Sequence, residues 1–252
     1  MWQVDGDEFY CDADLKRICQ LLIDSPETTT ISFPGRDFWG CLQYQVDGPY
    51  MRGTRVCGQI HRLFKWGNGY QYVTHRLATV ADEKGRNLRE IEWVGRDAIA
   101  EMGVVLFHYS SIFPKQMMEK VRYYAALNVE ERPDDATSAL ERWEKVSAPF
   151  HVHNVKEYPS WLERYCGRHP EQIELMWQDI ESGVIDIETR DTGDVEALMQ
   201  NPLFRVVRAV LRQWPSQKAI GRRGGYAVHR FMCWLAAWFD GWWSGRSCDK
   251  RE

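Results

Sequence analysis

The apolar pattern of this chain changes at Pro114, and that change limits the folds that the sequence can adopt. Before Pro114, short apolar and β-branched runs alternate with turn residues, which is typical of strands. After Pro114, apolar residues recur with the spacing of one helix face. Predicted strands cover residues 28–33, 55–65, 70–80 and 103–109, and predicted helices cover residues 15–22, 136–146, 160–165, 170–182 and 194–214 as well as the segment after Pro114. We therefore predict an α/β part, residues 1–128, followed by a mainly helical region, residues 129–252.

The composition is that of a folded protein without a general affinity for nucleic acid. Hydrophobic residues make up 44% of the chain, charged residues make up 27%, and the formal net charge is -4. No basic excess is available to displace counterions from phosphate. The seven cysteines form no CxxC pair, which is typical of reduced thiols. With no secretory leader and no apolar run long enough to cross a bilayer, the sequence predicts a soluble cytoplasmic protein.

An acidic cluster, Asp5-Gly6-Asp7-Glu8, follows a short strand-like stretch. Two carboxylates on a tight turn can hold a hard divalent cation, which prefers oxygen ligands and keeps several waters. A diphosphate can complete the coordination of such a cation, which then neutralises charge on a departing phosphate. The bare pattern is more often an exposed acidic turn, so its interpretation depends on the rest of the chain.

Four segments in a fixed order resemble the family 2 glycosyltransferases of the GT-A fold. They are WQVDGDEF, ISFPGRDFWG, IHRLFKWGNGYQYVTHR and VVLFHYSSIFPKQMMEKVRYY. They look like that family's acidic strand end, its R-x-F-x-G strand end, its R-L-F segment and its H-Y-S-x-x-x-P-K-Q stretch before a helix. Two later segments, PFHVHNVKEYPSWLERYCGRHPEQI and RDTGDVEALMQNP, resemble the tail of one bacterial subgroup, so the likeness extends over residues 1–205.

The resemblance implies a metal-assisted transfer of a sugar from a nucleoside diphosphate donor to a glycan or glycolipid acceptor, with inversion at the anomeric carbon. By this resemblance, Asp7 binds Mn²⁺ or Mg²⁺, Asp5 faces the nucleotide ribose or a metal-bound water, and Glu8 completes the same site. Arg62 matches an arginine whose guanidinium pairs with phosphate oxygens, and His108 matches a histidine that returns to the metal or the diphosphate.

Two departures from the family pattern bear on activity. Relatives often carry a His-Glu pair after the aromatic strand, where this chain has His75-Arg76. We expect His75 on the acceptor side, and Asp37 or Glu101 as substitutes for the missing base. The half of the GT-A fold that binds the nucleotide base precedes the acidic motif in relatives and is expected to be missing here, so these residues alone should bind the donor weakly. The alternative is a non-catalytic carbohydrate- or partner-binding remnant of a glycosyltransferase.

Aromatic residues and histidines suggest further candidates. The tryptophans at positions 39, 66, 93, 143 and 161 could line an acceptor groove, although core packing is the simpler interpretation for each. Trp39 is the strongest of them because it follows a predicted strand end, where ligands gather in open α/β sheets. His151 and His153 would share one face of a strand and could form a metal pair, but a structural role is favoured because no third ligand is evident.

The C-terminal stretch FMCWLAAWFDGWW follows Arg222, Arg223 and Arg230. Aromatic residues beside arginines are typical of helices that lie in a membrane interface, and the stretch is too short to span a bilayer. A terminal helix docked on the domain or on a partner chain is the equal alternative. The sequence therefore predicts either a peripheral membrane contact or a packed helix here.

Overall fold

The chain passes from one structural unit to another within a single strand, β2 (Thr30–Trp39). The computed structural model describes residues 1–49, 51–52, 59–74, 78–126, 140–152, 158–213 and 223–248. Unit 1 consists of Met1–Arg36, Val56–Tyr109 and Gly167–Asp186, and unit 2 consists of Asp37–Arg55, Ser110–Cys166 and Ile187–Glu252. Both units mix helices with strands, so the predicted α/β class is confirmed. The predicted boundary at residue 128 does not coincide with this division, because each unit is assembled from three separate segments.

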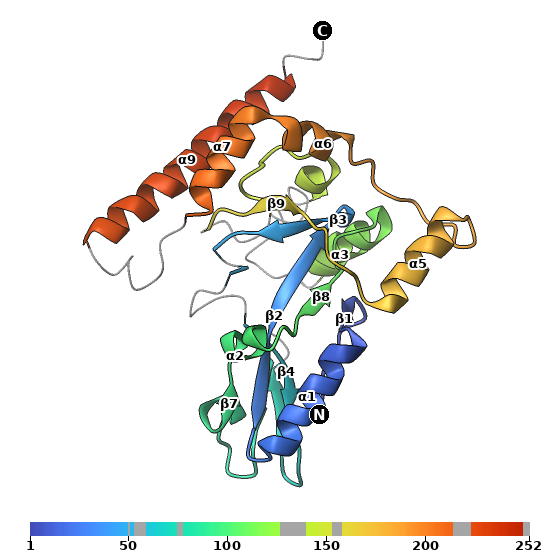
Figure 1. Cartoon of the computed structure of the whole chain (residues 1–252), viewed down its shortest axis with the longest axis vertical. Helices are drawn as coiled ribbons and strands as arrows, with labels where there is room; N and C mark the ends of the chain where they lie inside the picture. The colour runs from blue at the N-terminus through green and yellow to red at the C-terminus, as the bar shows by residue number, and fades with distance from the viewer. Residues whose placement is uncertain are drawn as a thin grey trace. The chain divides into compact units, whose positions relative to one another are not determined.

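The sheet of unit 1 is centred on the first part of β2 (Figure 1). Strand β4 (Gln59–Phe64) pairs antiparallel with β2, and β7 (Trp93–Val94) pairs parallel with it. Because both partners meet Thr30 and Ile31, they lie on opposite edges of β2. The order continues from β2 to β8 (Leu106–His108) and then β1 (Glu8–Phe9). With neighbours on both edges, β2 is buried from Thr30 to Phe33.

Helix α1 (Asp12–Asp24) forms as its apolar spacing predicts. Ile18 is fully buried against Ile31, Phe33 and Leu106, and the other apolar residues of the same face pack around this core. Unit 1 also contains β5 (Gln71–Thr74), β6 (Thr79–Ala81), the 3-10 helix η1 (Leu88–Glu90), α2 (Arg96–Glu101) and α5 (Glu171–Glu181). The single strand predicted for residues 70–80 is instead an antiparallel pair, β5 and β6.

Unit 2 packs helices around a short sheet. The end of β2 turns at Gly40, whose φ of 72° favours glycine, into β3 (Cys41–Asp47), and β3 pairs antiparallel with β9 (Trp161–Arg164). Its helices include α3 (Pro114–Ala126), α6 (Gly193–Gln200), α7 (Pro202–Leu211) and α9 (Arg223–Cys248). Four buried aromatic residues form the centre of the core: Phe150, Trp161, Phe204 and Phe239.

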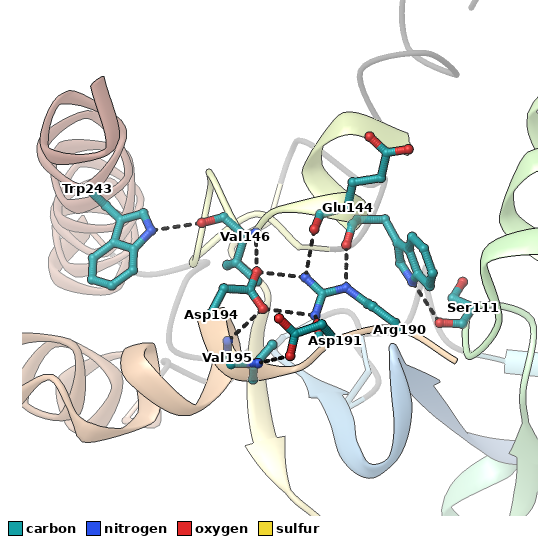
Figure 2. Close-up of polar contacts among 10 residues, drawn as sticks. Ser111, Glu144, Val146, Arg190, Asp191, Asp194, Val195 and Trp243 are labelled. Atoms are coloured by element: carbon teal, nitrogen blue, oxygen red, sulfur yellow. Dashed lines mark hydrogen bonds and ion pairs between the residues drawn. The ribbon is translucent and has the colours of Figure 1, made fainter. Parts of the chain in front are cut away.

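The guanidinium of Arg190 joins three parts of unit 2 (Figure 2). It donates to the carbonyl oxygens of Trp143, at 2.7 Å, and Glu144, at 3.2 Å, and it forms an ion pair with Asp194 at 2.6 Å. The same group lies over the ring of Trp39, 4.5 Å from its centroid. Because only 4% of the Arg190 side chain is exposed, each of these contacts replaces water that the cation has lost.

Two predictions for the helical region are wrong. Residues 160–165 contain strand β9 rather than a helix, because Trp161 and Leu162 are both buried and pair with β3. The helix predicted for residues 194–214 is two helices, α6 and α7. The break falls at Asn201, whose side chain accepts hydrogen bonds from Leu203 N and Phe204 N and so starts a new helix at Pro202.

Other helix predictions are confirmed where the structure describes them. Helices α3 and α5 form as expected, and residues 140–144 are helical within the predicted segment 136–146. His153 lies outside the described residues, and of the basic, glycine-rich segment 221–225 only residues 223–225 are described, where they begin helix α9. Among the described helices, none combines the length and the apolar character needed to cross a membrane.

Candidate functional site

The acidic cluster lies against the strand that carries His108. Strand β1 pairs antiparallel with β8, so that Glu8 is opposite His108 and Phe9 is opposite Phe107. Just before β1, the carbonyl of Asp7 accepts a hydrogen bond of 2.8 Å from Tyr109 N. The backbone therefore brings together two segments of unit 1 that are far apart in the sequence.

The two predicted metal ligands meet at this point. His108 Nε2 lies 3.6 Å from Asp7 Oδ2, and the two side chains are 26% and 31% exposed. A carboxylate oxygen and an imidazole nitrogen suit a first-row divalent ion such as Mn²⁺, whereas Mg²⁺ prefers oxygen ligands alone. In the part of the chain that the structure describes, no group of three or more His, Cys, Asp or Glu residues could hold a metal. A cation at Asp7 and His108 would therefore need oxygens from a ligand and from water.

The other members of the predicted site form a closed ionic cluster. Arg62 Nη2 lies 2.9 Å from Asp5 Oδ2, and Arg62 Nε donates to Glu8 Oε2 at 2.7 Å. The second oxygen of Glu8 accepts from Arg62 Nη2, so the contact has two hydrogen bonds. This is the planar geometry in which arginine binds a carboxylate most strongly.

Burial makes this cluster structural. The Glu8 side chain is 2% exposed and that of Arg62 is 14% exposed. Burial opposes the charge of Arg62, but its hydrogen bonds to Glu8 and the nearby negative charges raise the pKa of the guanidinium. Because Arg62 sits on β4 and Glu8 on β1, their contact connects these two strands. The structure thus engages Arg62 with carboxylates, in place of the phosphate oxygens that the resemblance implies.

Aromatic residues and one further histidine surround the same strand end. Tyr109 Oη lies 2.8 Å from His169 Nδ1, and the Tyr109 ring stacks on Phe107 and packs edge-on against Phe9. The guanidinium of Arg36 lies 5.8 Å from the centroid of the Phe107 ring. The sequence gives no indication of this contact, because His169 stands out there only by its position before Pro170.

The remaining predicted residues have different places in the chain. Asp37 belongs to unit 2, at the end of β2, where it is half-buried. His75 lies outside the described residues, and Glu101 is exposed at the end of α2. Trp39 is buried in unit 2 beneath Arg190, so it is a core residue and does not line an exposed groove. His151 is hydrogen-bonded to Asp240 at 2.6 Å, which is a contact between a loop and helix α9.

A buried serine and histidine in unit 1 resemble a nucleophile and its base, but their hydrogen bonds exclude that role. His61 Nδ1 lies 2.5 Å from Ser32 Oγ, and Arg89 Nη1 lies 3.1 Å from His61 Nε2. Arginine can only donate, so Nε2 accepts and Nδ1 carries the proton that it donates to Ser32. Burial, together with Arg89 and Arg62, lowers the pKa of His61 to about 4. A histidine that already donates to the hydroxyl cannot take its proton, so the pair is structural.

Comparisons with models of protein families, with curated proteins and with solved structures find no match to this chain.

Proposed function

We propose that this chain is a glycosyltransferase related to the family 2 enzymes of GT-A fold, and that it transfers a sugar from a nucleoside diphosphate donor to a glycan or glycolipid. The observation that supports the proposal is the meeting of Asp7 and His108, 3.6 Å apart. The resemblance implies that both residues bind the same cation. They belong to two separate segments of unit 1, Met1–Arg36 and Val56–Tyr109. Their separation matches two ligands of one ion.

In this proposal, the residues of the ionic cluster position the ligands and do not touch the donor. Asp7 and His108 hold the cation, which when bound neutralises charge on the leaving diphosphate. Arg62 and Glu8 fix β1 against β4, and the hydrogen bond from Tyr109 N to the Asp7 carbonyl fixes the same segment against β8. The Asp7 carboxylate is therefore held from two sides before any ligand binds.

The test is the stabilisation of the protein by Mn²⁺ with UDP, GDP or TDP. A ligand at one hundred times its Kd stabilises the folded state by about 2.7 kcal/mol, so the thermal midpoint of the natural protein should rise measurably. Asp7→Asn and His108→Gln should abolish this rise, whereas Asp97→Asn, at an exposed site on α2, should keep it. An unchanged response in the Asp7 and His108 variants would contradict the assignment of the metal ligands.

Glu8→Gln distinguishes positioning from ligand binding. Removing one charge from a buried pair costs about 3 kcal/mol, because the Arg62 guanidinium then stays buried without its full partner. We expect Glu8→Gln to lower the stability of the protein without any ligand, and Asp7→Asn to leave that stability nearly unchanged. Equal losses in the two variants would show that the acidic cluster does not divide into a buried and an exposed part as proposed.

The second candidate is a non-catalytic carbohydrate- or partner-binding relative of these enzymes. It is favoured by one observation: Asp5, Glu8 and Arg62 already satisfy one another, which leaves only Asp7 and His108 of the predicted ligand set for a cation. This candidate predicts that Mn²⁺ with a nucleoside diphosphate gives no stabilisation, while a glycan does. Isothermal titration of the natural protein with UDP-, GDP- and TDP-sugars, each with and without Mn²⁺, separates the two, because only the enzyme should bind in a metal-dependent way.

A further inference from the structure

Helix α9 has two different faces. One packs on unit 2, where Met232, Ala236 and Phe239 are buried. On the other face, the rings of Phe231, Trp234 and Trp238 are 52%, 59% and 44% exposed. These three rings follow one another along the helix, with centroids 6.0 Å and 6.5 Å apart. We call these three side chains the aromatic ladder.

The packed face of α9 is fixed by specific contacts as well as by apolar burial. Asp240 accepts a hydrogen bond of 2.7 Å from Phe150 N and contacts His151, while Trp243 Nε1 donates to the carbonyl of Val146 at 2.8 Å (Figure 2). These contacts set the rotation of the helix about its axis. The ladder is therefore held outward by the fold and cannot turn inward without breaking them.

The sequence that leads up to and includes the ladder carries charge of one sign. Residues 197–239 contain no Asp or Glu, although the whole chain has more acidic than basic residues and a net charge of -4. The same segment contains seven basic residues: Arg205, Arg208, Arg212, Lys218, Arg222, Arg223 and Arg230. Arg208 and Arg212 are paired with the buried Glu163, whereas Arg205 on α7 and Arg230 beside the ladder are exposed. Helix α7 lies alongside α9 in unit 2 (Figure 1).

The one acidic residue of α9 also faces away from the ladder. Asp240 is turned toward His151 on the packed face, and burial raises the pKa of its carboxyl group. Two copies of this face, brought together by a twofold axis, would place Arg230 and its basic surroundings against themselves. A partner for the face must combine an apolar layer with negative charge. An anionic membrane has both, and tryptophan is the side chain that prefers the boundary between its layers.

We propose that the aromatic ladder of α9 docks this protein on the surface of an anionic lipid bilayer, with Phe231, Trp234 and Trp238 in the interfacial layer and Arg230 at the level of the headgroups. The 26-residue helix, about 39 Å long, lies along the surface and does not cross it. This inference rests on unit 2 alone, and it stands or falls separately from the proposed transferase activity.

The experiment is flotation of the natural protein with vesicles of phosphatidylcholine, alone or mixed with phosphatidylglycerol. We expect flotation with the mixed vesicles and much less with phosphatidylcholine alone. The variant Phe231→Ser/Trp234→Ser/Trp238→Ser should lose about a hundredfold in affinity, since each half-exposed ring contributes part of its transfer free energy. Arg230→Gln should lower the affinity for the mixed vesicles about fivefold and leave that for phosphatidylcholine vesicles unchanged, because one basic residue near an anionic surface contributes about that factor to binding.

The matched control is Trp66→Ser/Val73→Ser/Leu175→Ser, which removes three exposed apolar side chains of unit 1. It should float as the natural protein does. Circular dichroism shows whether each variant is folded, and if the triple ladder variant is not, the single change Trp234→Ser should still weaken flotation about fivefold. Equal flotation of the ladder variant and the control overturns the proposal. The proposal is also overturned if the natural protein stays in solution with both vesicle types. In that case, light scattering would show whether the ladder instead holds an oligomer that dissociates when the ladder is replaced.

Discussion

Replacing Arg190 by methionine should destabilise unit 2 more than replacing an exposed arginine of the same unit by methionine. Methionine keeps much of the length of the side chain but removes every hydrogen bond of the guanidinium. The carbonyls of Trp143 and Glu144 lose their donors, and the carboxylate of Asp194 loses its ion pair. Asp194 still accepts from Val146 N and Val195 N, so it is not left without partners.

The size of the effect follows from burial. Removing one partner of a buried ion pair costs about 3 to 5 kcal/mol, because the other charge is left without compensation. Arg190 is 4% exposed, but Asp194 is 27% exposed, so water can solvate part of the remaining carboxylate. We therefore expect the lower end of this range, about 3 kcal/mol, for Arg190→Met. Arg190→Lys should recover only part of the loss, because an ammonium cannot reproduce the planar fork.

Hydrogen exchange followed by mass spectrometry is the suitable assay, because it reports on each unit separately. Peptides covering residues 140–150 and 193–211 should exchange faster in Arg190→Met, while those of β1 and α1 in unit 1 should be unchanged. The control is Arg205→Met, which changes an exposed arginine of α7 and should cost less than about 0.5 kcal/mol. If the two variants exchange alike, the contacts of Arg190 do not hold the unit together and the reasoning is wrong.

Three further predictions concern stability. The pKa of His61 is lowered from 6.5 to about 4 in the folded state, so its full stabilisation should be present above pH 6.5, and up to about 3 kcal/mol of it should be lost as the pH falls toward 4. The stability of His61→Asn in urea unfolding should therefore depend less on pH than that of the natural protein, and an equal dependence would refute this. Asn201→Ala removes the cap of α7 and should cost about 1 kcal/mol in urea unfolding, and no loss would mean that water replaces the cap. Gly48→Ala, with φ of 149° and a new Cβ 2.5 Å from the Pro159 carbonyl, should lower the thermal midpoint, whereas Gly241→Ala, in open space on α9, should not.

Local sequence patterns predicted where helices and strands form better than they predicted which segments pair or pack with one another. The spacing of apolar residues indicated α1, and a β-branched run indicated β2, because each is decided by which faces of a segment are buried. Strand β9 was missed because four residues carry no readable period, and its conformation depends on pairing with β3. The division into units was missed for the same reason: contacts between distant segments define it.

In the candidate site too, the sequence indicated individual residues but not the contacts between distant segments. The resemblance to a family named Asp7 and His108 as ligands of one ion, and they do lie together. Nothing in the sequence indicated that Arg62 would be engaged by Glu8 and Asp5, because that contact joins β4, which pairs with β2, to the segment of β1, which pairs with β8. Nor could spacing indicate the contact between Tyr109 and His169, which lie on separate segments of unit 1.

The carboxylates of the acidic cluster are best understood as having two different roles. Asp7 lies in the turn just before β1 and Glu8 is the first residue of that strand, and the two carboxylates have different neighbours: Asp7 lies beside His108, and Glu8 binds Arg62. The exposed fractions agree, at 31% for the Asp7 side chain and 2% for that of Glu8. The buried carboxylate holds Arg62, and the exposed one lies beside His108. A run of acidic residues therefore need not supply several ligands: here, Glu8 fixes strand β1, and Asp7 is presented from the turn just before that strand.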